Sequence, residues 1–253
     1  MYREKDDNNQ MITLLYHARA NGAICKRIAA ESGGVIQALC DKDQPIQHLD
    51  GMLVRWDSRS DSFHADKEVN SAAAVILSRN KRRARMALEG ICPATWFVKR
   101  DCQFPCVVRP KRHFGGHNFF LCNNQDELVK AIRRFGAGGW YASEFIAKSD
   151  EFRIFVINGE AFKIVRRYRK DADPTQPWNA HNGGLSKRIK PENWPAGLAA
   201  IAESAAEKLG LDLCAVDVIA KDAKQYVLEA NTAPGLERQG TIRRFAKLLM
   251  EMA

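Results

Sequence analysis

Apolar runs and amphipathic stretches alternate over the first part of the chain. Residues 11–16 (MITLLY) predict a strand, and residues 22–32 predict a helix that ends at a glycine pair. Two further apolar runs, residues 35–39 and 51–56, predict short strands. This strand–helix–strand order is typical of an α/β domain with parallel pairing. The region contains no glycine-rich phosphate loop, so we expect no catalytic chemistry in it.

Hydrophobic periodicity in the rest of the chain alternates between helix and strand. It predicts helices over residues 70–77, 80–90, 127–134, 195–209 and 241–252. It predicts strands over residues 104–110, 140–146, 153–157, 161–165, 211–220 and 225–231. The Asn158-Gly159 pair between two of these strands is typical of a tight hairpin turn. The mixture predicts an α+β fold that follows the α/β N-terminal domain.

The last predicted hairpin places polar side chains together. If residues 222–224 form its loop, Asp217 lies directly opposite Glu229, with Cβ atoms roughly 5 Å apart. Strand alternation puts Asn231 on the same face as Glu229. Two adjacent carboxylates repel each other unless a proton or a cation lies between them, and this set of oxygen ligands suits Mg²⁺. A solvent-facing hairpin with scattered acidic residues is the alternative.

Composition indicates a globular protein of the cytoplasm. The chain has 253 residues, of which 45% are hydrophobic and 27% charged. No apolar run reaches the roughly 20 residues needed to cross a bilayer, and the charged N-terminus lacks a signal-peptide core. The seven cysteines are an odd and scattered set, which favours free thiols in a reducing compartment. The pattern Cys102-x3-Cys106 with His113-x3-His117 does not favour zinc, because its six-residue gap is shorter than finger spacing.

The net charge of +9 indicates an anionic ligand or substrate. Basic residues cluster at residues 79–85, 99–112 and 163–170. Such clusters neutralise nucleotide phosphates, an acidic substrate or nucleic acid, or they form solvated surface. Because no recognised nucleic-acid-binding motif accompanies them, nucleic acid is not the favoured partner.

Residues 228–236 (LEANTAPGL), preceded by residues 216–218 (VDV), resemble the C-terminal signature of the ATP-grasp ligases. This superfamily includes D-alanine–D-alanine ligase and the RimK-like enzymes. The resemblance implies that Asp217, Glu229 and Asn231 bind the magnesium of ATP, as two Mg²⁺ ions with Mn²⁺ as an alternative. It implies an ATP-grasp fold, in which two α+β subdomains grip ATP. We expect an N-terminal α/β domain at residues 1–78, a small subdomain with a glycine-rich lid at 79–146, and a metal-binding subdomain at 147–253.

The same resemblance implies a set of nucleotide-binding residues: Lys81, Arg109, His113, Gly115, Gly116, Glu144, Phe145, Ile146, Glu151 and Lys163. Arg109 stands where most members have lysine, and arginine keeps the charge and grips phosphate through two nitrogens. Glu144, Phe145 and Ile146 match the hinge whose backbone binds adenine, and Glu151 matches the acid that binds ribose. The Arg-Pro-x-Arg-His-x-Gly-Gly form of the lid most resembles a partly phage-encoded branch of the family.

The catalytic residues implied by the resemblance are Arg153, Arg166 and Asn179. Asn179, His181, Gly183 and Gly184 match the RimK-like loop N-x-H-x-G-G. Pro177 stands where that loop carries an arginine, and Arg166 or Arg169 could supply the missing guanidinium.

The implied activity is that of an ATP-dependent carboxylate–amine ligase, which forms an amide through an acylphosphate. Its substrates would be a small-molecule or peptide carboxylate and an amine, and the surplus positive charge indicates an anionic acceptor such as an acidic amino acid or peptide. The alternatives are a kinase on the same fold and a nucleic-acid-binding protein without ligase activity. The sequence leaves the oligomeric state open.

Overall fold

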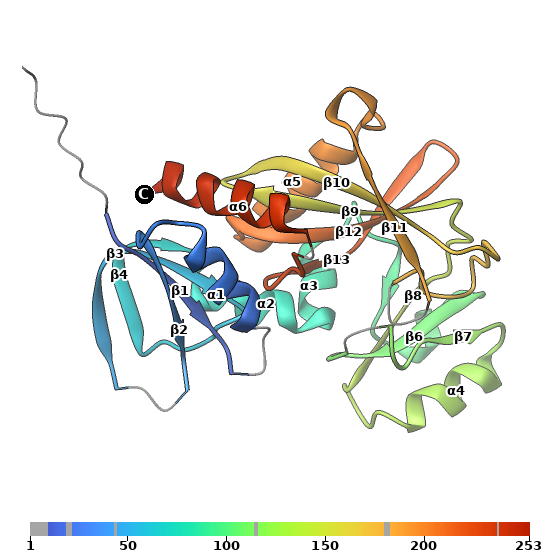
Figure 1. The fold of residues 1–253 in the computed structure, drawn as a ribbon. Helices are drawn as coiled ribbons and strands as arrows, with labels where there is room; N and C mark the ends of the chain where they lie inside the picture. Colours follow the sequence, from blue (N-terminus) through green and yellow to red (C-terminus); the bar gives the residue numbers. More distant parts are fainter. Residues whose placement is uncertain (1–9, 19–21, 43–44, 114–115, 180–182, 237) are drawn as a thin grey trace, which may run out of the picture. The chain divides into compact units, whose positions relative to one another are not determined.

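The computed structural model describes residues 10–18, 22–42, 45–113, 116–179, 183–236 and 238–253. The chain divides into two compact units, one comprising Met1–Val75 with Thr232–Ala253 and the other Ile76–Asn231 (Figure 1). The C-terminal segment therefore belongs with the N-terminal residues rather than with the hairpin that precedes it. The division of residues 79–253 into two ATP-grasp subdomains stays a prediction.

The first unit contains a parallel sheet, as the N-terminal pattern predicts. Its strands have the order β2-β1-β3-β4, and every neighbouring pair is parallel. The elements are β1 (Ile12–Tyr16), α1 (Gly22–Ala30), β2 (Ile36–Cys40), β3 (Gln47–Trp56), β4 (Phe63–Val69) and α6 (Gln239–Met252). Strand β4 was not predicted because only its end residues, Phe63 and Val69, are buried and its centre is polar. Helix α6 packs on α1, and its Phe245 contacts Trp56 edge-on at 5.5 Å.

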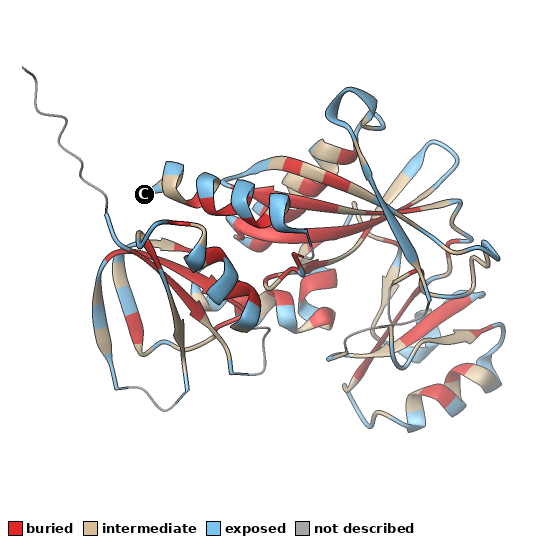
Figure 2. Cartoon of the chain, viewed as in Figure 1, coloured by how far each residue is buried: buried red, intermediate tan, exposed pale blue. Residues whose placement is uncertain are grey.

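The second unit contains a five-stranded antiparallel sheet of order β11-β10-β9-β12-β13. Helix α5 packs on one face of this sheet, where it contacts β9, β10, β12 and β13. Figure 2 shows that β9 and β12 at the centre are largely buried, whereas the edge strand β11 is exposed. The elements are β9 (Asp150–Ile157), β10 (Glu160–Tyr168), β11 (Leu185–Ile189), α5 (Leu198–Leu209), β12 (Leu213–Lys221) and β13 (Lys224–Asn231).

A smaller antiparallel sheet of order β5-β8-β6-β7 lies in the same unit, with α4 packed against β6 and β7. Its elements, with two helices that precede it in the chain, are α2 (Ala72–Arg79), α3 (Lys81–Ala87), β5 (Thr95–Trp96), β6 (Cys106–Pro110), β7 (Phe120–Cys122), α4 (Gln125–Arg133) and β8 (Trp140–Glu144). Helix α4 begins after Asn124, whose side chain accepts a hydrogen bond from the Glu127 amide at 3.0 Å and so satisfies a free helical N–H group.

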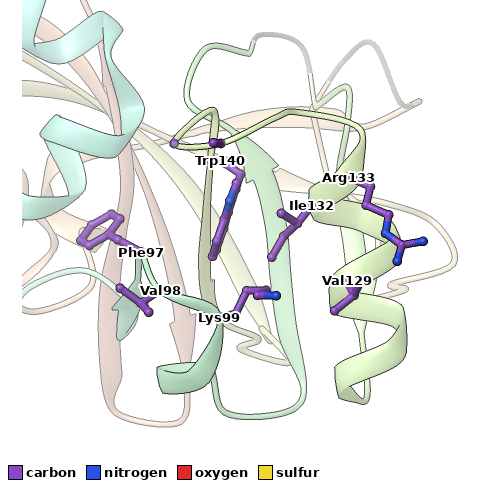
Figure 3. A pocket seen from close by; sticks show the side chains of 9 residues that line it. Phe97, Val98, Lys99, Val129, Ile132, Arg133 and Trp140 are labelled. Atoms are coloured by element: carbon purple, nitrogen blue, oxygen red, sulfur yellow. The ribbon is translucent and has the colours of Figure 1, made fainter.

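Consecutive residues of β8 face opposite sides of the small sheet. Trp140 packs in the core beneath α4 and lines a pocket of about 470 Å³ together with Val129, Ile132 and Phe97 (Figure 3). The next residue, Tyr141, bonds to His113 instead. The pocket and the basic residues around His113 therefore lie on opposite faces of this sheet.

Candidate active site

The C-terminal hairpin brings the predicted carboxylates opposite each other. Asp217 pairs with Glu229 across β12 and β13, which confirms the predicted register. The predicted loop is wrong in detail, because the turn contains two residues, Asp222 and Ala223, and the strands pair again at Lys224. Asp222 has a positive φ of 55°, as tight two-residue turns require. A bulge at Leu228 adds one residue to β13 and restores the opposition of the two acids.

Four strands place charged side chains on the face of the large sheet that carries this pair. Asp217 pairs with Arg153 of β9 as well as with Glu229 of β13. On the other side of β9, Glu151 pairs with Arg167 of β10. Because paired residues and alternate residues of a strand share a face, all five side chains lie on one side of the sheet.

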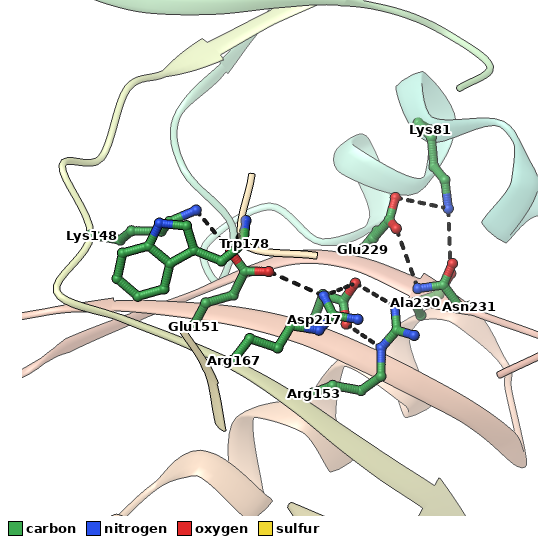
Figure 4. Close-up of polar contacts among 10 residues, drawn as sticks. All are labelled: Lys81, Lys148, Glu151, Arg153, Arg167, Trp178, Asp217, Glu229, Ala230 and Asn231. Carbon is green, nitrogen blue, oxygen red and sulfur yellow. Dashed lines mark hydrogen bonds and ion pairs between the residues drawn. The ribbon is translucent and has the colours of Figure 1, made fainter. Parts of the chain in front are cut away.

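Asp217 is bound by two arginines (Figure 4). The Arg153 guanidinium donates from Nε to Oδ1 at 2.7 Å and from Nη2 to Oδ2 at 2.8 Å. Arg167 Nη1 donates to Oδ2 at 3.1 Å. The side chains are 7% exposed for Asp217, 22% for Arg153 and 12% for Arg167, so this is a largely buried ionic cluster. Such a cluster loses most when one partner is removed, because the remaining charges stay buried.

Glu229 faces Lys81, the first residue of α3. The Lys81 Nζ lies 3.4 Å from Glu229 Oε2 and donates to the Ala230 carbonyl, also at 3.4 Å. Asn231 donates from Nδ2 to Glu229 Oε1 at 3.3 Å, which confirms that the amide lies on the same face as the carboxylate. Burial opposes ionisation of Glu229, but Lys81, Arg109 and Arg153 outweigh it and hold the pKa of Glu229 well below its usual range. Glu229 is therefore a carboxylate.

Arg109 and His113 lie near enough to Glu229 for its charge to oppose the lowering of their pKa values by burial. Arg109 donates from Nη2 to the His117 carbonyl at 3.0 Å, and its buried Nε has no hydrogen-bond partner among the described residues. His113 Nε2 lies 2.9 Å from the Tyr141 hydroxyl. Burial lowers the pKa of His113 to about 2, and Arg109 acts in the same direction, so the imidazole is neutral. Gly115 of the predicted lid lies outside the described residues, and the described Gly116 follows it with a φ of 80°.

Replacing His113 by Gln is expected to weaken the loss of stability at acidic pH. The unfolded imidazole takes up a proton below about pH 6.5, whereas the folded one stays neutral down to about pH 2. The unfolded state then binds more protons, so stability falls as the pH falls, by at most about 1.4 kcal/mol per pH unit for one group. Urea unfolding of wild type and His113→Gln at pH 7 and pH 5 measures this. Equal losses in both proteins would contradict it.

Glu151 has its carboxylate surrounded by internal partners. Lys148 Nζ donates to Oε2 at 2.8 Å, Arg167 Nη1 donates to Oε1 at 3.1 Å, and the Trp178 amide donates to Oε2 at 3.4 Å. The Lys148 ammonium also lies 4.9 Å from the Trp178 ring centroid. Lys148, Arg167 and Trp178 were not among the predicted site residues. In the sequence, Lys148 stands three residues before the predicted Glu151. Arg167 is far from Glu151 in the sequence, and only the register of the β9–β10 hairpin brings the two together.

Arg166 is not brought to the acidic face of the sheet. It alternates with Arg167, is 53% exposed and forms an ion pair with Asp150 at 2.6 Å. Arg167 lies beside Asp217 instead, and Arg169, the other arginine considered, forms an ion pair with Asp171. Lys163 precedes Arg167 by four residues in β10, so the two side chains lie on the same face of the sheet. The Lys163 ammonium lies 4.7 Å from the Phe155 ring centroid.

The predicted hinge follows directly on β8. Glu144 ends the strand, and its amide donates to the Ala94 carbonyl at 2.8 Å. The Phe145 amide donates to the Pro105 carbonyl at 3.2 Å, and Ile146 is 8% exposed. The amides of the first two hinge residues are therefore engaged in holding the segment to its neighbours.

Asn179 lies in the loop between β10 and β11. Its carbonyl accepts a hydrogen bond from the Gly184 amide at 2.9 Å. A Cβ at Gly184 would lie 2.1 Å from the Trp178 carbonyl oxygen, so only glycine fits this turn. His181 of the same predicted motif lies outside the described residues.

The seven cysteines are free thiols, and among the described residues they belong to no cluster that could hold a metal ion. Cys106 is buried opposite Cys122 in the small sheet, and burial raises the pKa of Cys106 to about 12. His113 points to Tyr141, so the Cys-His pattern does not converge. Over the described residues, no helix combines the length and apolarity needed to span a membrane.

The residues on this face fit a divalent ion that carries a polyphosphate. Asp217, Glu229 and Asn231 supply two carboxylates and an amide oxygen, a donor set that suits Mg²⁺. Both oxygens of Asp217 accept hydrogen bonds from arginines in this structure, so binding an ion there would require at least one of these bonds to give way. The basic side chains near these ligands, Lys81, Arg109, Arg153 and Arg167, outnumber the two carboxylates. Two buried guanidinium nitrogens, Nη1 of Arg85 and Nε of Arg109, have no hydrogen-bond partner among the described residues. Unpaired buried donors of this kind are costly unless an anion is bound.

Solved structures with a similar fold include ATP-grasp ligases. The D-alanine–D-alanine ligase of Bacillus anthracis, complexed with ATP, superposes with a TM-score of 0.64 at 14% identity, over 96% of each chain. A RimK domain ATP-grasp protein of Sphaerobacter thermophilus superposes with a TM-score of 0.62 at 16% identity, over 95% of this chain and 98% of the other. The likeness establishes an ATP-grasp fold and confirms the predicted fold class.

Sequence similarity shows to which family of ATP-grasp proteins the chain belongs. Residues 93–246 match the family model of the RimK-like ATP-grasp domain. A protein of Legionella pneumophila (strain Corby) named "Probable alpha-L-glutamate ligase" is 30% identical over 188 residues, which are 67% of this chain and 60% of the relative. The chain belongs to the RimK-like ATP-grasp family, as the C-terminal signature predicted. It spans about 60% of the length of these relatives.

Proposed function

We propose that this protein is an ATP-dependent carboxylate–amine ligase. The observation that carries the proposal is the arrangement of Asp217, Glu229 and Asn231 beside Lys81 on one face of the large sheet. Membership of the RimK-like family supports it, because relatives are named as glutamate ligases. The fold supports it too, because structural neighbours include an ATP complex of a D-alanine–D-alanine ligase.

The proposed reaction has two steps. In the first, a carboxylate oxygen of the acid substrate forms a bond to the γ-phosphorus of ATP, the bond to the bridging oxygen breaks, and ADP leaves. In the second, the amine nitrogen attacks the acyl carbon of the acylphosphate, loses a proton and expels inorganic phosphate. Positioning and neutralisation of charge supply most of the catalysis in such phosphoryl transfers.

We assign the phosphates of ATP to Lys81 and Arg109, and the transferred group to Arg153 with Arg167. The cations balance charge that accumulates as the phosphoryl group moves. Arg167 takes the place proposed for Arg166 because it lies on the acidic face. Asp217, Glu229 and Asn231 would hold Mg²⁺, as two ions with Mn²⁺ as an alternative, which supplies further neutralisation of the phosphate charge.

We assign the remaining predicted residues to the periphery of the nucleotide. Gly115, Gly116 and His113 would form the lid, and the segment from Glu144 to Ile146 would bind adenine. Glu151 would bind ribose only if it gave up one of the partners that surround it, since both of its oxygens accept hydrogen bonds. Lys163 would contact the nucleotide, and Asn179 would lie beside the substrates.

The net charge of +9 supports an anionic acceptor, and we propose an acidic amino acid or an acidic peptide. Incubation with ATP, Mg²⁺ and a panel of amino acids and acidic peptides, followed by ADP assay and mass spectrometry, tests this. Hydroxylamine added to the reaction should trap the acylphosphate as a hydroxamate of the acid substrate. ATP consumption that phosphorylates a hydroxyl group and yields no hydroxamate would favour a kinase. Nucleic-acid binding that survives Asp217→Ala, without ATP turnover, would overturn the enzyme assignment.

A further inference from the structure

Helix α3 directs two basic residues into the protein. Lys81 and Arg85 are four positions apart, so they lie on the same side of the helix, and they are 8% and 6% exposed. The neighbouring Met86, an apolar residue, is 57% exposed. The buried side of α3 is therefore partly cationic, which an ordinary core contact does not explain.

Arg85 has little in the described protein to balance its charge. Its Nη1 is buried without a hydrogen-bond partner among the described residues. Its guanidinium carbon lies 5.7 Å from the Tyr141 ring centroid. A cation–π contact offsets only part of the cost of taking a guanidinium out of water.

The surroundings of Arg85 are basic as well. Tyr141 bonds through its hydroxyl to His113 and pairs with Arg109 across β6 and β8. Burial lowers the pKa of Arg109, and the charge of Arg85 acts in the same direction, while Glu229 opposes both. Lys81 already forms an ion pair with Glu229. One carboxylate is thus shared by several cations, and the local charge is positive.

We propose that Arg85 binds the phosphates of the nucleotide, as a further phosphate-binding residue beside Lys81 and Arg109. The inference rests on the proposed function, because it takes ATP as the anion. ATP carries several negative charges in a short span and would fill the missing hydrogen bonds of Nη1 and of Arg109 Nε together. Arg85 lies outside the region matched by the family model, residues 93–246.

Arg85→Met tests the proposal because the two possible roles of Arg85 predict opposite effects. If Arg85 serves the nucleotide, the variant without ligand should be as stable as wild type or more stable, since a poorly balanced buried charge has been removed. Its affinity for ATP with Mg²⁺ should fall by at least about tenfold, the effect of losing a charged hydrogen bond. Its affinity for adenosine, which has no phosphate, should stay unchanged.

Thermal unfolding without ligand and calorimetric titration with ATP and adenosine measure both effects. Arg83→Met, on the exposed side of α3, is the matched control and should bind ATP as wild type does. Arg85→Lys keeps the charge and should recover part of the affinity. An ATP affinity of Arg85→Met equal to wild type, or a loss of stability or folding without ligand, would overturn the role of Arg85. Failure of the wild type itself to bind ATP would instead overturn the proposed function.

Discussion

Asp217→Asn is expected to abolish ligation and to destabilise the protein at the same time. The substitution keeps one oxygen but removes the charge that would hold Mg²⁺, so ADP release should fall by at least roughly 100-fold. It also leaves Arg153 without its carboxylate, and Arg167 with Glu151 alone, in a largely buried cluster. Removing one partner of such a cluster costs about 3–5 kcal/mol. Steady-state ADP release and urea unfolding of the protein without ligand measure the two losses.

Glu229→Gln tests the opposite carboxylate of the proposed metal site. Glu229 has 23% of its side chain exposed and forms its ion pair with Lys81 at 3.4 Å, a looser contact than those of Asp217. We expect a comparable loss of ADP release, together with a loss of stability, because Lys81, Arg109 and Arg153 lose the carboxylate that they share. If both variants fold and release ADP at the rate of wild type, the assignment of the metal site to this hairpin is incorrect.

The opposition of Asp217 and Glu229 in the C-terminal hairpin could be predicted from sequence because its information is local. Short apolar strands, a polar turn and a two-residue side-chain period were sufficient to place Asp217 opposite Glu229. The length of the turn and the bulge at Leu228 could not be predicted from this local pattern. A three-residue loop without a bulge and a two-residue turn with one give the same register, and the choice depends on the φ of Asp222.

The side of the sheet on which each arginine lies could not be read from the sequence. Strand β10 contains a register irregularity between Ala161 and Lys163. A shift of one residue moves every later side chain of a strand to the other face, so it decides whether Arg166 or Arg167 meets Asp217. Hydrophobic periodicity could not predict that Lys81 lies next to Glu229, for a different reason. These residues belong to elements far apart in the chain, and only the family resemblance connected them.

Arg167→Gln is expected to lower kcat by roughly 100-fold, whereas Arg166→Gln should leave kcat close to wild type. Arg167 is 12% exposed and bridges Glu151 and Asp217, so its charge acts in a largely buried site. Arg166 is 53% exposed in a surface ion pair with Asp150, a contact worth at most about 1 kcal/mol of stability. Because the two residues are adjacent in one strand, each variant controls for the other.

The measurement is kcat and KM for ATP in both variants, with Arg167→Lys as the conservative replacement. Arg153 still grips both oxygens of Asp217 in Arg167→Gln, so that variant should fold. A loss in kcat that Arg167→Lys partly restores, with a smaller change in KM, indicates a charge that acts on the transferred group. A larger loss in Arg166→Gln than in Arg167→Gln would show that the exposed arginine serves the reaction, and it would require that side chain to reach the acidic face during turnover.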